Sequence, residues 1–106
     1  MRDKTMKFLV IRKPRVGTAL IPTSKSIREH KEGALNAVKQ ATLDCIYAIP
    51  GGGGSVAIAN ADSIEQLNEN LANTPLFLFS EFEIRPLTNY AKYMDGVAAA
   101  FEKQGR

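Results

Sequence analysis

The spacing of hydrophobic and polar residues along the chain predicts four strands and three helices. Short apolar or alternating runs are typical of strands, and apolar positions three and four apart are typical of helices. The pattern predicts strands over residues 6–12, 43–49, 55–59 and 76–84. It predicts helices capped by Thr23 or Ser24, by Asp62 or Ser63, and by Thr88. Pro50 and Pro86 are expected to end the second and fourth strands.

Each predicted element has an apolar side. The first helix should turn one side to the sheet, namely Ile27, His30, Ala34, Ala37, Val38 and Ala41. The second strand should place alternate residues on one face, namely Leu43, Cys45, Tyr47 and Ile49. The last helix has an apolar side made of Tyr90, Tyr93, Met94, Val97 and Phe101. The Gly51–Gly54 run joins two strands and predicts a flexible hairpin; it opens no helix, so it does not predict a phosphate loop.

The order β-α-β-β-α-β is the split βαβ pattern of an α+β, ferredoxin-like fold, here with an extra C-terminal helix. Such a fold has a four-stranded antiparallel sheet with helices on one face and leaves the other face in need of cover. We expect one domain over residues 1–106, with residues 1–5 as a flexible tail. We expect the uncovered face to be buried against a second copy, giving a dimeric α/β barrel.

Composition and charge narrow the function classes. The net charge is +3, and most of the excess positive charge lies in the first fifteen residues, which suggests attraction of an anionic small molecule. The sequence contains no basic stripe interleaved with aromatic residues, so it does not predict nucleic-acid binding. Its apolar runs are too short to predict a membrane span or a signal peptide. We therefore expect a cytoplasmic protein. A single cysteine, Cys45, and a single histidine, His30, make a metal site unexpected.

The stretch from Ile49 to Arg85 resembles muconolactone isomerase. A strand after glycine leads into a helix with leucines four apart, and Pro-Leu-Phe follows. The residues that carry the resemblance are Ser55, Val56, Ser63, Leu67, Leu71, Pro75, Leu76, Phe77, Phe82, Glu83 and Ile84. The resemblance implies a dimeric α/β barrel and isomerisation of a small unsaturated lactone acid by proton transfer. It also implies a catalytic carboxylate on the first helix, where this chain has His30, with Glu29 and Glu32 nearby.

His30 is the first candidate for catalysis, because an imidazole can take and return a proton near neutral pH. Glu32 is the alternative base if it, rather than His30, turns inward. Tyr47 is a candidate hydrogen-bond donor to a substrate oxygen. Lys7 and Arg12 are candidate anion contacts, and Cys45, on the predicted face of Tyr47, is a further candidate for substrate binding. Asp44 should pair with Arg12 or Arg85, since an unpaired buried charge is costly.

Two functions follow as hypotheses. The first is a small isomerase or cyclase that needs no cofactor and acts on an unsaturated anionic small molecule. The second is a non-catalytic dimeric barrel that binds a small ligand or serves in assembly, because such folds host many functions. A cavity that touches His30 would favour the enzyme.

Overall fold

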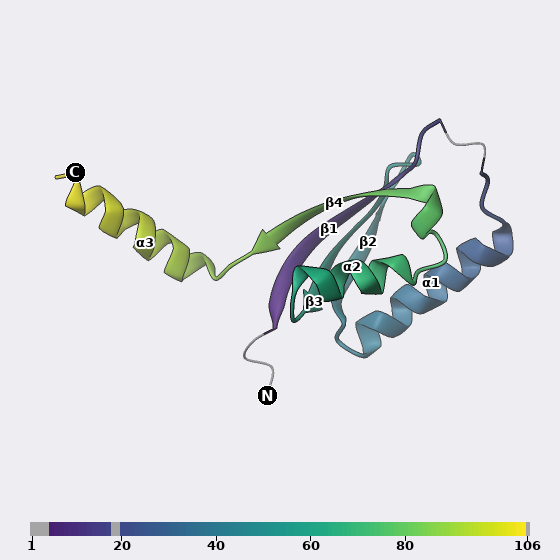
Figure 1. The fold of residues 1–106 in the computed structure, drawn as a ribbon, viewed down its shortest axis with the longest axis horizontal. Coiled ribbons are helices and arrows are strands. Elements are labelled where there is room, and N and C mark those ends of the chain that lie inside the picture. Colours follow the sequence, from purple (N-terminus) through teal and green to yellow (C-terminus); the bar gives the residue numbers. More distant parts are fainter. Residues whose placement is uncertain (1–4, 18–19, 106) are drawn as a thin grey trace.

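The chain forms the expected β-α-β-β-α-β unit followed by a C-terminal helix (Figure 1). The computed structural model describes residues 5–17 and 20–105. Its elements are β1 (Met6–Pro14), α1 (Ser24–Lys39), β2 (Leu43–Ile49), β3 (Gly54–Ala61), α2 (Ile64–Ala72), the 3₁₀ turn η1 (Phe77–Phe79), β4 (Ser80–Leu87) and α3 (Tyr90–Lys103). Residues 1–4 of the expected tail lie outside the described residues.

The four strands make one antiparallel sheet in the order β2-β3-β1-β4. Residues directly opposite each other in such a sheet share a face. Phe8, Val10 and Arg12 of β1 lie opposite Ala59, Ala57 and Ser55 of β3. This face carries α1 and α2, and its core cluster consists of Phe8, Val10, Ala59, Ala61 and Leu67. The α+β fold predicted from the element order is therefore confirmed.

The other face of the sheet carries neither α1 nor α2, and we call it the open face. Two rows of opposed residues cross its centre: Leu9, Ile58 and Cys45 in one, and Ile11, Val56 and Tyr47 in the other. Charged side chains flank these rows, including Arg85 opposite Leu9 and Glu83 opposite Ile11. The open face is thus apolar at its centre and charged at its β4 edge.

The prediction that Leu43, Cys45, Tyr47 and Ile49 share a face is wrong, because β2 contains a β-bulge. The register of β2 shifts between Leu43, opposite Ala59, and Cys45, opposite Ile58. A bulge inserts one extra residue and so resets the alternation. Leu43 therefore faces the helices, together with Ile46 opposite Ala57, while Cys45 and Tyr47 lie on the open face.

The prediction of a strand over residues 76–84 is wrong at both ends. Residues 77–79 form η1, because the backbone turns back: Phe77 N–H donates to Thr74 O (3.2 Å) and Phe79 N–H to Leu76 O (3.0 Å). The strand then runs through Pro86 to Leu87, opposite Phe8 and Lys7. β4 is an edge strand, where a proline needs no partner on its outer side. Asn89, not Thr88, caps α3, since its side chain accepts from Lys92 N–H.

α3 extends away from the sheet instead of packing on it (Figure 1). The chain is 58 Å long, and its radius of gyration is 17.2 Å, whereas a compact domain of this size has about 13 Å. The apolar side of α3 is consequently exposed, with Tyr90, Tyr93, Met94 and Phe101 all open to solvent. Among the described residues, no helix has the length and apolar character needed to cross a membrane.

Candidate functional site

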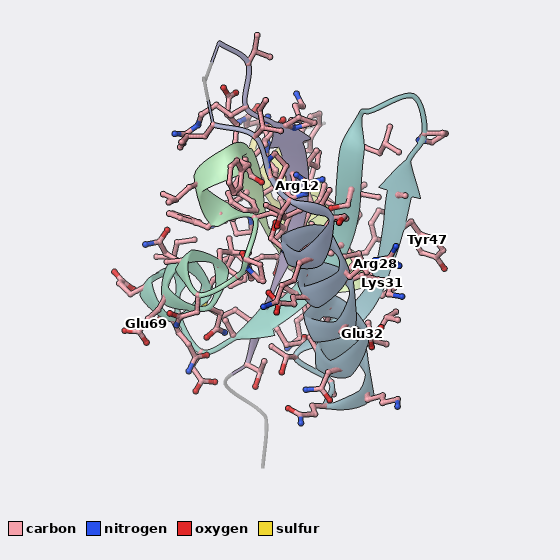
Figure 2. The ribbon with its side chains drawn as sticks, turned by 90° about the vertical axis from the view of Figure 1, so that its right-hand side faces the viewer. Arg12, Arg28, Lys31, Glu32, Tyr47 and Glu69 are labelled. Carbon is pink, nitrogen blue, oxygen red and sulfur yellow. The ribbon has the colours of Figure 1, made fainter. Side chains whose placement is uncertain are left out.

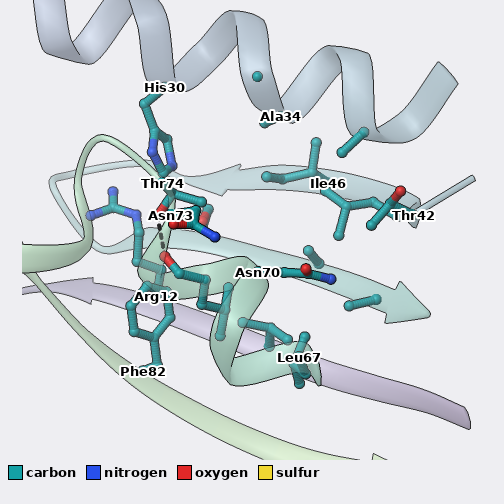
Figure 3. A pocket seen from close by; sticks show the side chains of 18 of the residues that line it. Arg12, His30, Ala34, Thr42, Ile46, Leu67, Asn70, Asn73, Thr74 and Phe82 are labelled. Carbon is teal, nitrogen blue, oxygen red and sulfur yellow. Dashed lines mark hydrogen bonds between the residues drawn. The ribbon is translucent and has the colours of Figure 1, made fainter. Parts of the chain in front are cut away.

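A cavity of about 280 Å³ lies between the helix-bearing face of the sheet and the two helices α1 and α2 (Figure 3). Its walls are mostly apolar. The side chains and backbone that line it come from Val10, Arg12, His30, Gly33, Ala34, Ala37, Thr42, Leu43, Ile46, Ser55, Ala57, Ala59, Asn60, Leu67, Asn70, Leu71, Asn73, Thr74, Pro75 and Phe82. A mostly apolar pocket with a few polar groups is typical of a small-molecule site.

Polar side chains gather at one end of this cavity. Figure 3 shows His30 of α1 and Arg12 of β1 approaching each other beside Asn73 and Thr74, which follow α2. Leu67 and Ile46 lie toward the other end. The Thr74 hydroxyl donates to Leu71 O at 2.7 Å, so its hydrogen is already in use. We call the group of Arg12, His30, Asn73 and Thr74 the polar end.

His30 has a ring nitrogen without a hydrogen-bond partner among the described residues. The residue is half-buried, and the nitrogen is its buried Nδ1. Burial lowers the pKa of His30, and the positive charge of Arg12 lowers that pKa further. Both effects favour the neutral form of the imidazole, which lines the largely apolar cavity. An unpartnered buried nitrogen is costly, and a bound ligand would relieve that cost.

Arg12 carries the permanent positive charge of the polar end. Its Nη1 donates to Ser80 Oγ at 3.0 Å, and its other guanidinium donors have no hydrogen bond to the described residues. Burial lowers the pKa of Arg12, but an arginine stays charged at neutral pH. The described residues that line the cavity include no aspartate or glutamate, so none of them neutralises this charge. The arrangement favours an anionic ligand.

The structure brings His30 and Arg12 together but places the other predicted site residues outside the cavity lining. Glu32 lies on the outward side of α1, exposed, with its Oε2 3.2 Å from the Lys31 amine (Figure 2). Tyr47 is 68% exposed and projects from the open face near the β2 edge. The bulge in β2 gives the physical reason, since it turns Tyr47 away from the helices.

Cys45 and Lys7 also lie on the open face of the sheet. The Lys7 amine donates to Asp44 Oδ2 at 2.6 Å and to Asn60 Oδ1 at 2.9 Å. The prediction that Arg12 or Arg85 pairs with Asp44 is therefore wrong, because Lys7 is the nearer cation on this face. The hydrogen bonds from Lys7 and Asn60 lower the pKa of Asp44.

Sequence reasoning missed Asn70, Asn73 and Thr74 as cavity residues. In the sequence, Asn73-Thr74-Pro75 is a helix stop, and polar residues at a stop carry no signal of a pocket. Only the way α2 lies across the sheet brings them to the cavity. In the described part of the chain, no cluster of three or more His, Cys, Asp or Glu side chains could hold a metal ion.

The fold and the cavity define a ferredoxin-like α+β domain with an apolar pocket between its sheet and its helices. Residues 6–92 match the family model described as muconolactone delta-isomerase, and the chain belongs to that family. A crystal structure of muconolactone isomerase is similar, with a TM-score of 0.69 and 22% sequence identity over 80% of this chain and 91% of that chain. This likeness shows the shared fold. No curated protein matches this chain.

Proposed function

We propose that this protein is a small cofactor-independent isomerase or cyclase that moves a proton on an unsaturated anionic small molecule, such as a lactone acid. The single observation that carries the proposal is the juxtaposition of a neutral, unpartnered His30 nitrogen with the Arg12 guanidinium in one apolar cavity. Membership of the muconolactone delta-isomerase family supports the reaction class.

The proposed chemistry needs one acid/base group and one cation. His30 takes a proton from the carbon beside a carbonyl group, and the electron pair of that C–H bond moves into the carbonyl oxygen as an enolate. The imidazolium then returns the proton to a different carbon, so the double bond moves and no atom is lost. Arg12 binds the carboxylate of the substrate through its free guanidinium donors.

The cavity also supports this chemistry through its polarity. Its mostly apolar walls lower the local polarity, which strengthens the attraction between Arg12 and a bound anion. Asn73 and Thr74 offer polar atoms beside the reacting groups. Glu32, by contrast, is exposed and lies near Lys31, so we assign the acid/base role to His30.

The alternative is a non-catalytic barrel that binds a small ligand in the same cavity. The described part of the lining contains no carboxylate, which favours this alternative, since the resemblance described above implies a catalytic carboxylate on the first helix. In that case the cavity would bind an anion and no proton would be exchanged.

We propose further that the protein is a homodimer and acts in the cytoplasm. The apolar centre of the open face supports the dimer, because a second copy would bury it. The single free cysteine, Cys45, fits a reducing compartment.

Proton–deuterium exchange on lactone and enone acids tests the proposed function. The wild-type chain should catalyse exchange beside the carbonyl, and His30→Gln should lose about 10²-fold or more of the rate, as expected when a general base is removed. Glu32→Gln is the matched control on the same helix and should keep the rate. Full activity of His30→Gln would overturn the role of His30. Binding of these acids without exchange would favour the ligand-binding alternative.

A further inference from the structure

One hydroxyl group connects the turn before β4 to the polar end of the cavity. Ser80 is only 2% exposed and is the first residue of β4, directly after η1. Its Oγ donates to Leu76 O at 2.6 Å and accepts from Arg12 Nη1 at 3.0 Å. The serine therefore links the backbone of the turn to the guanidinium.

The direction of each hydrogen bond is fixed by chemistry. A serine hydroxyl has one hydrogen, and here that hydrogen is given to Leu76 O. Its lone pairs are then left for Arg12, which can only donate. The short hydrogen bond to Leu76 O fixes the orientation of the Ser80 hydroxyl. The lone pairs of Ser80 Oγ that accept from Arg12 therefore point in one direction.

The backbone of Ser80 is itself held against β1. Arg15 N–H donates to Phe79 O at 2.8 Å, and Arg15 Nη2 lies 3.4 Å from Ser80 O. Ser80 is also paired with Pro14 in the sheet. The backbone before Ser80 and the backbone of Ser80 itself are therefore both bonded to β1 or to Arg15, which fixes the position of the hydroxyl.

We propose that Ser80 is a positioning residue whose hydroxyl holds the Arg12 guanidinium at the polar end of the cavity. The proposal deepens the proposed function, in which Arg12 is the anion contact, and its geometry does not depend on catalysis. Burial disfavours the charged form of Arg12. Without the hydroxyl, the guanidinium would therefore move toward water, where its charge is better solvated.

A purely structural role for Ser80 makes a different prediction. If the hydroxyl only closed the η1 turn, its loss would lower the free energy of unfolding. It would leave the electrostatic potential that Arg12 produces inside the cavity unchanged. The ionisation of His30 separates the two roles, since Arg12 lowers the pKa of His30 by its charge. His30 is the only histidine in the sequence, so its imidazole resonance can be followed without ambiguity.

Few other charges face His30. Among the described residues of the cavity lining, Arg12 is the only other titratable one, and β2, β3 and α2 contribute apolar or neutral polar side chains. On α1 itself, Arg28, Glu29, Lys31 and Glu32 are exposed to solvent. These four are unchanged in the variants below, so a change at His30 reports on Arg12.

The experiment is an NMR titration of the His30 imidazole in the full-length wild type, Arg12→Gln, Ser80→Ala and Ser63→Ala. Arg12→Gln should raise the pKa of His30, because a positive charge is removed. Ser80→Ala should raise that pKa part of the way toward the Arg12→Gln value. Ser63→Ala, the matched control, also removes a hydrogen-bonded serine hydroxyl but does so at the start of α2, and should leave the pKa as in wild type.

Ser80→Cys keeps the test available if Ser80→Ala does not fold. A thiol is larger than the hydroxyl but keeps a polar atom at the same place, and it is a weaker acceptor, so the pKa of His30 should rise in the same direction. A wild-type pKa of His30 in a folded Ser80 variant would overturn the proposal, and so would the lack of any change in Arg12→Gln. The measured pKa values of His30 do not depend on proton exchange activity. Failure of the proposed function is therefore distinguishable from failure of the proposed role of Ser80.

Discussion

His30 should make the stability of the protein depend on pH in a defined window. Burial and Arg12 lower the pKa of His30 below its ordinary value of 6.5, so the unfolded chain binds a proton more readily than the folded one. Stability from this group is then complete above pH 6.5 and is lost as the pH falls through the folded-state pKa. Urea unfolding of wild type should show a larger loss between pH 7 and pH 5 than His30→Gln.

Two carboxylates also have lowered pKa values, but they do not affect stability within the pH window of His30. Asp44 and Glu83 both have pKa values below their ordinary values of 3.8 and 4.5, so they titrate below the range from pH 7 to pH 5. Equal losses for wild type and His30→Gln between pH 7 and pH 5 would contradict the buried, neutral state of His30.

Ala41 offers a second prediction at the residue scale. It follows α1 with a φ of 63°, in the left-handed region that glycine adopts without strain. Ala41→Gly should stabilise the fold by about 0.5–1 kcal/mol, which is the strain relieved less the extra flexibility of glycine when unfolded. Ala37→Gly, inside the same helix, should cost about 1 kcal/mol. The two midpoints of urea unfolding should therefore move in opposite directions, and movement in the same direction would contradict this account.

At the scale of elements, the four-glycine hairpin between β2 and β3 is a defined turn. Gly51, Gly52 and Gly54 all have positive φ, and a Cβ on Gly54 would lie 1.7 Å from Arg12 O. Gly54→Ala should therefore cost at least about 2 kcal/mol, from strain and from displacement of β1. Gly51→Ala meets nothing within 4 Å and should cost only about 1–2 kcal/mol of backbone strain. Equal unfolding midpoints for the two variants would show that the close approach to Arg12 has no energetic weight.

The elements also show what periodicity can predict and what it cannot. The bounds of β2 and the caps at Thr23 and Ser63 follow from local sequence, because a side chain and its neighbouring backbone decide them. The bulge at Asp44 and the η1 turn do not. Both depend on contacts with distant strands, such as Leu43 with Ala59 and Arg15 with Phe79. These two features decide that Tyr47 lies outside the cavity and that Ser80 contacts Arg12.

At the scale of the whole molecule, the sequence predicts the order of the elements better than their placement. The element order already implies the antiparallel sheet and the cavity side of α1, where His30 and Ala34 lie. The sequence of α3 does not predict that this helix extends away from the sheet. An apolar stripe has the same pattern whether the protein's own sheet or another molecule covers it. The family match ends at residue 92, within the first turn of α3.

The proposed dimer gives the prediction that belongs to this scale. Leu9 lies at the centre of the open face, opposite Ile58 on one side and Arg85 on the other. If two open faces pack together, Leu9→Glu places a carboxylate at the apolar centre of the contact, where Ile58 is one neighbour and Arg85, already bonded to Glu83, is the other. Burial of this charge costs about 3 kcal/mol and raises the dimer Kd by about 100-fold. Analytical ultracentrifugation of wild type should show a dimer, and Leu9→Glu should shift it toward a folded monomer.

Leu78→Glu is the control for that experiment, since Leu78 is an exposed leucine in η1, outside the open face. It should leave the dimer intact. A wild type that stays monomeric at high concentration would contradict self-association altogether. A dimer that survives Leu9→Glu would instead exclude the open face as the contact. The exposed apolar side of α3 would then be the surface to test next, with Phe101→Glu in the same measurement.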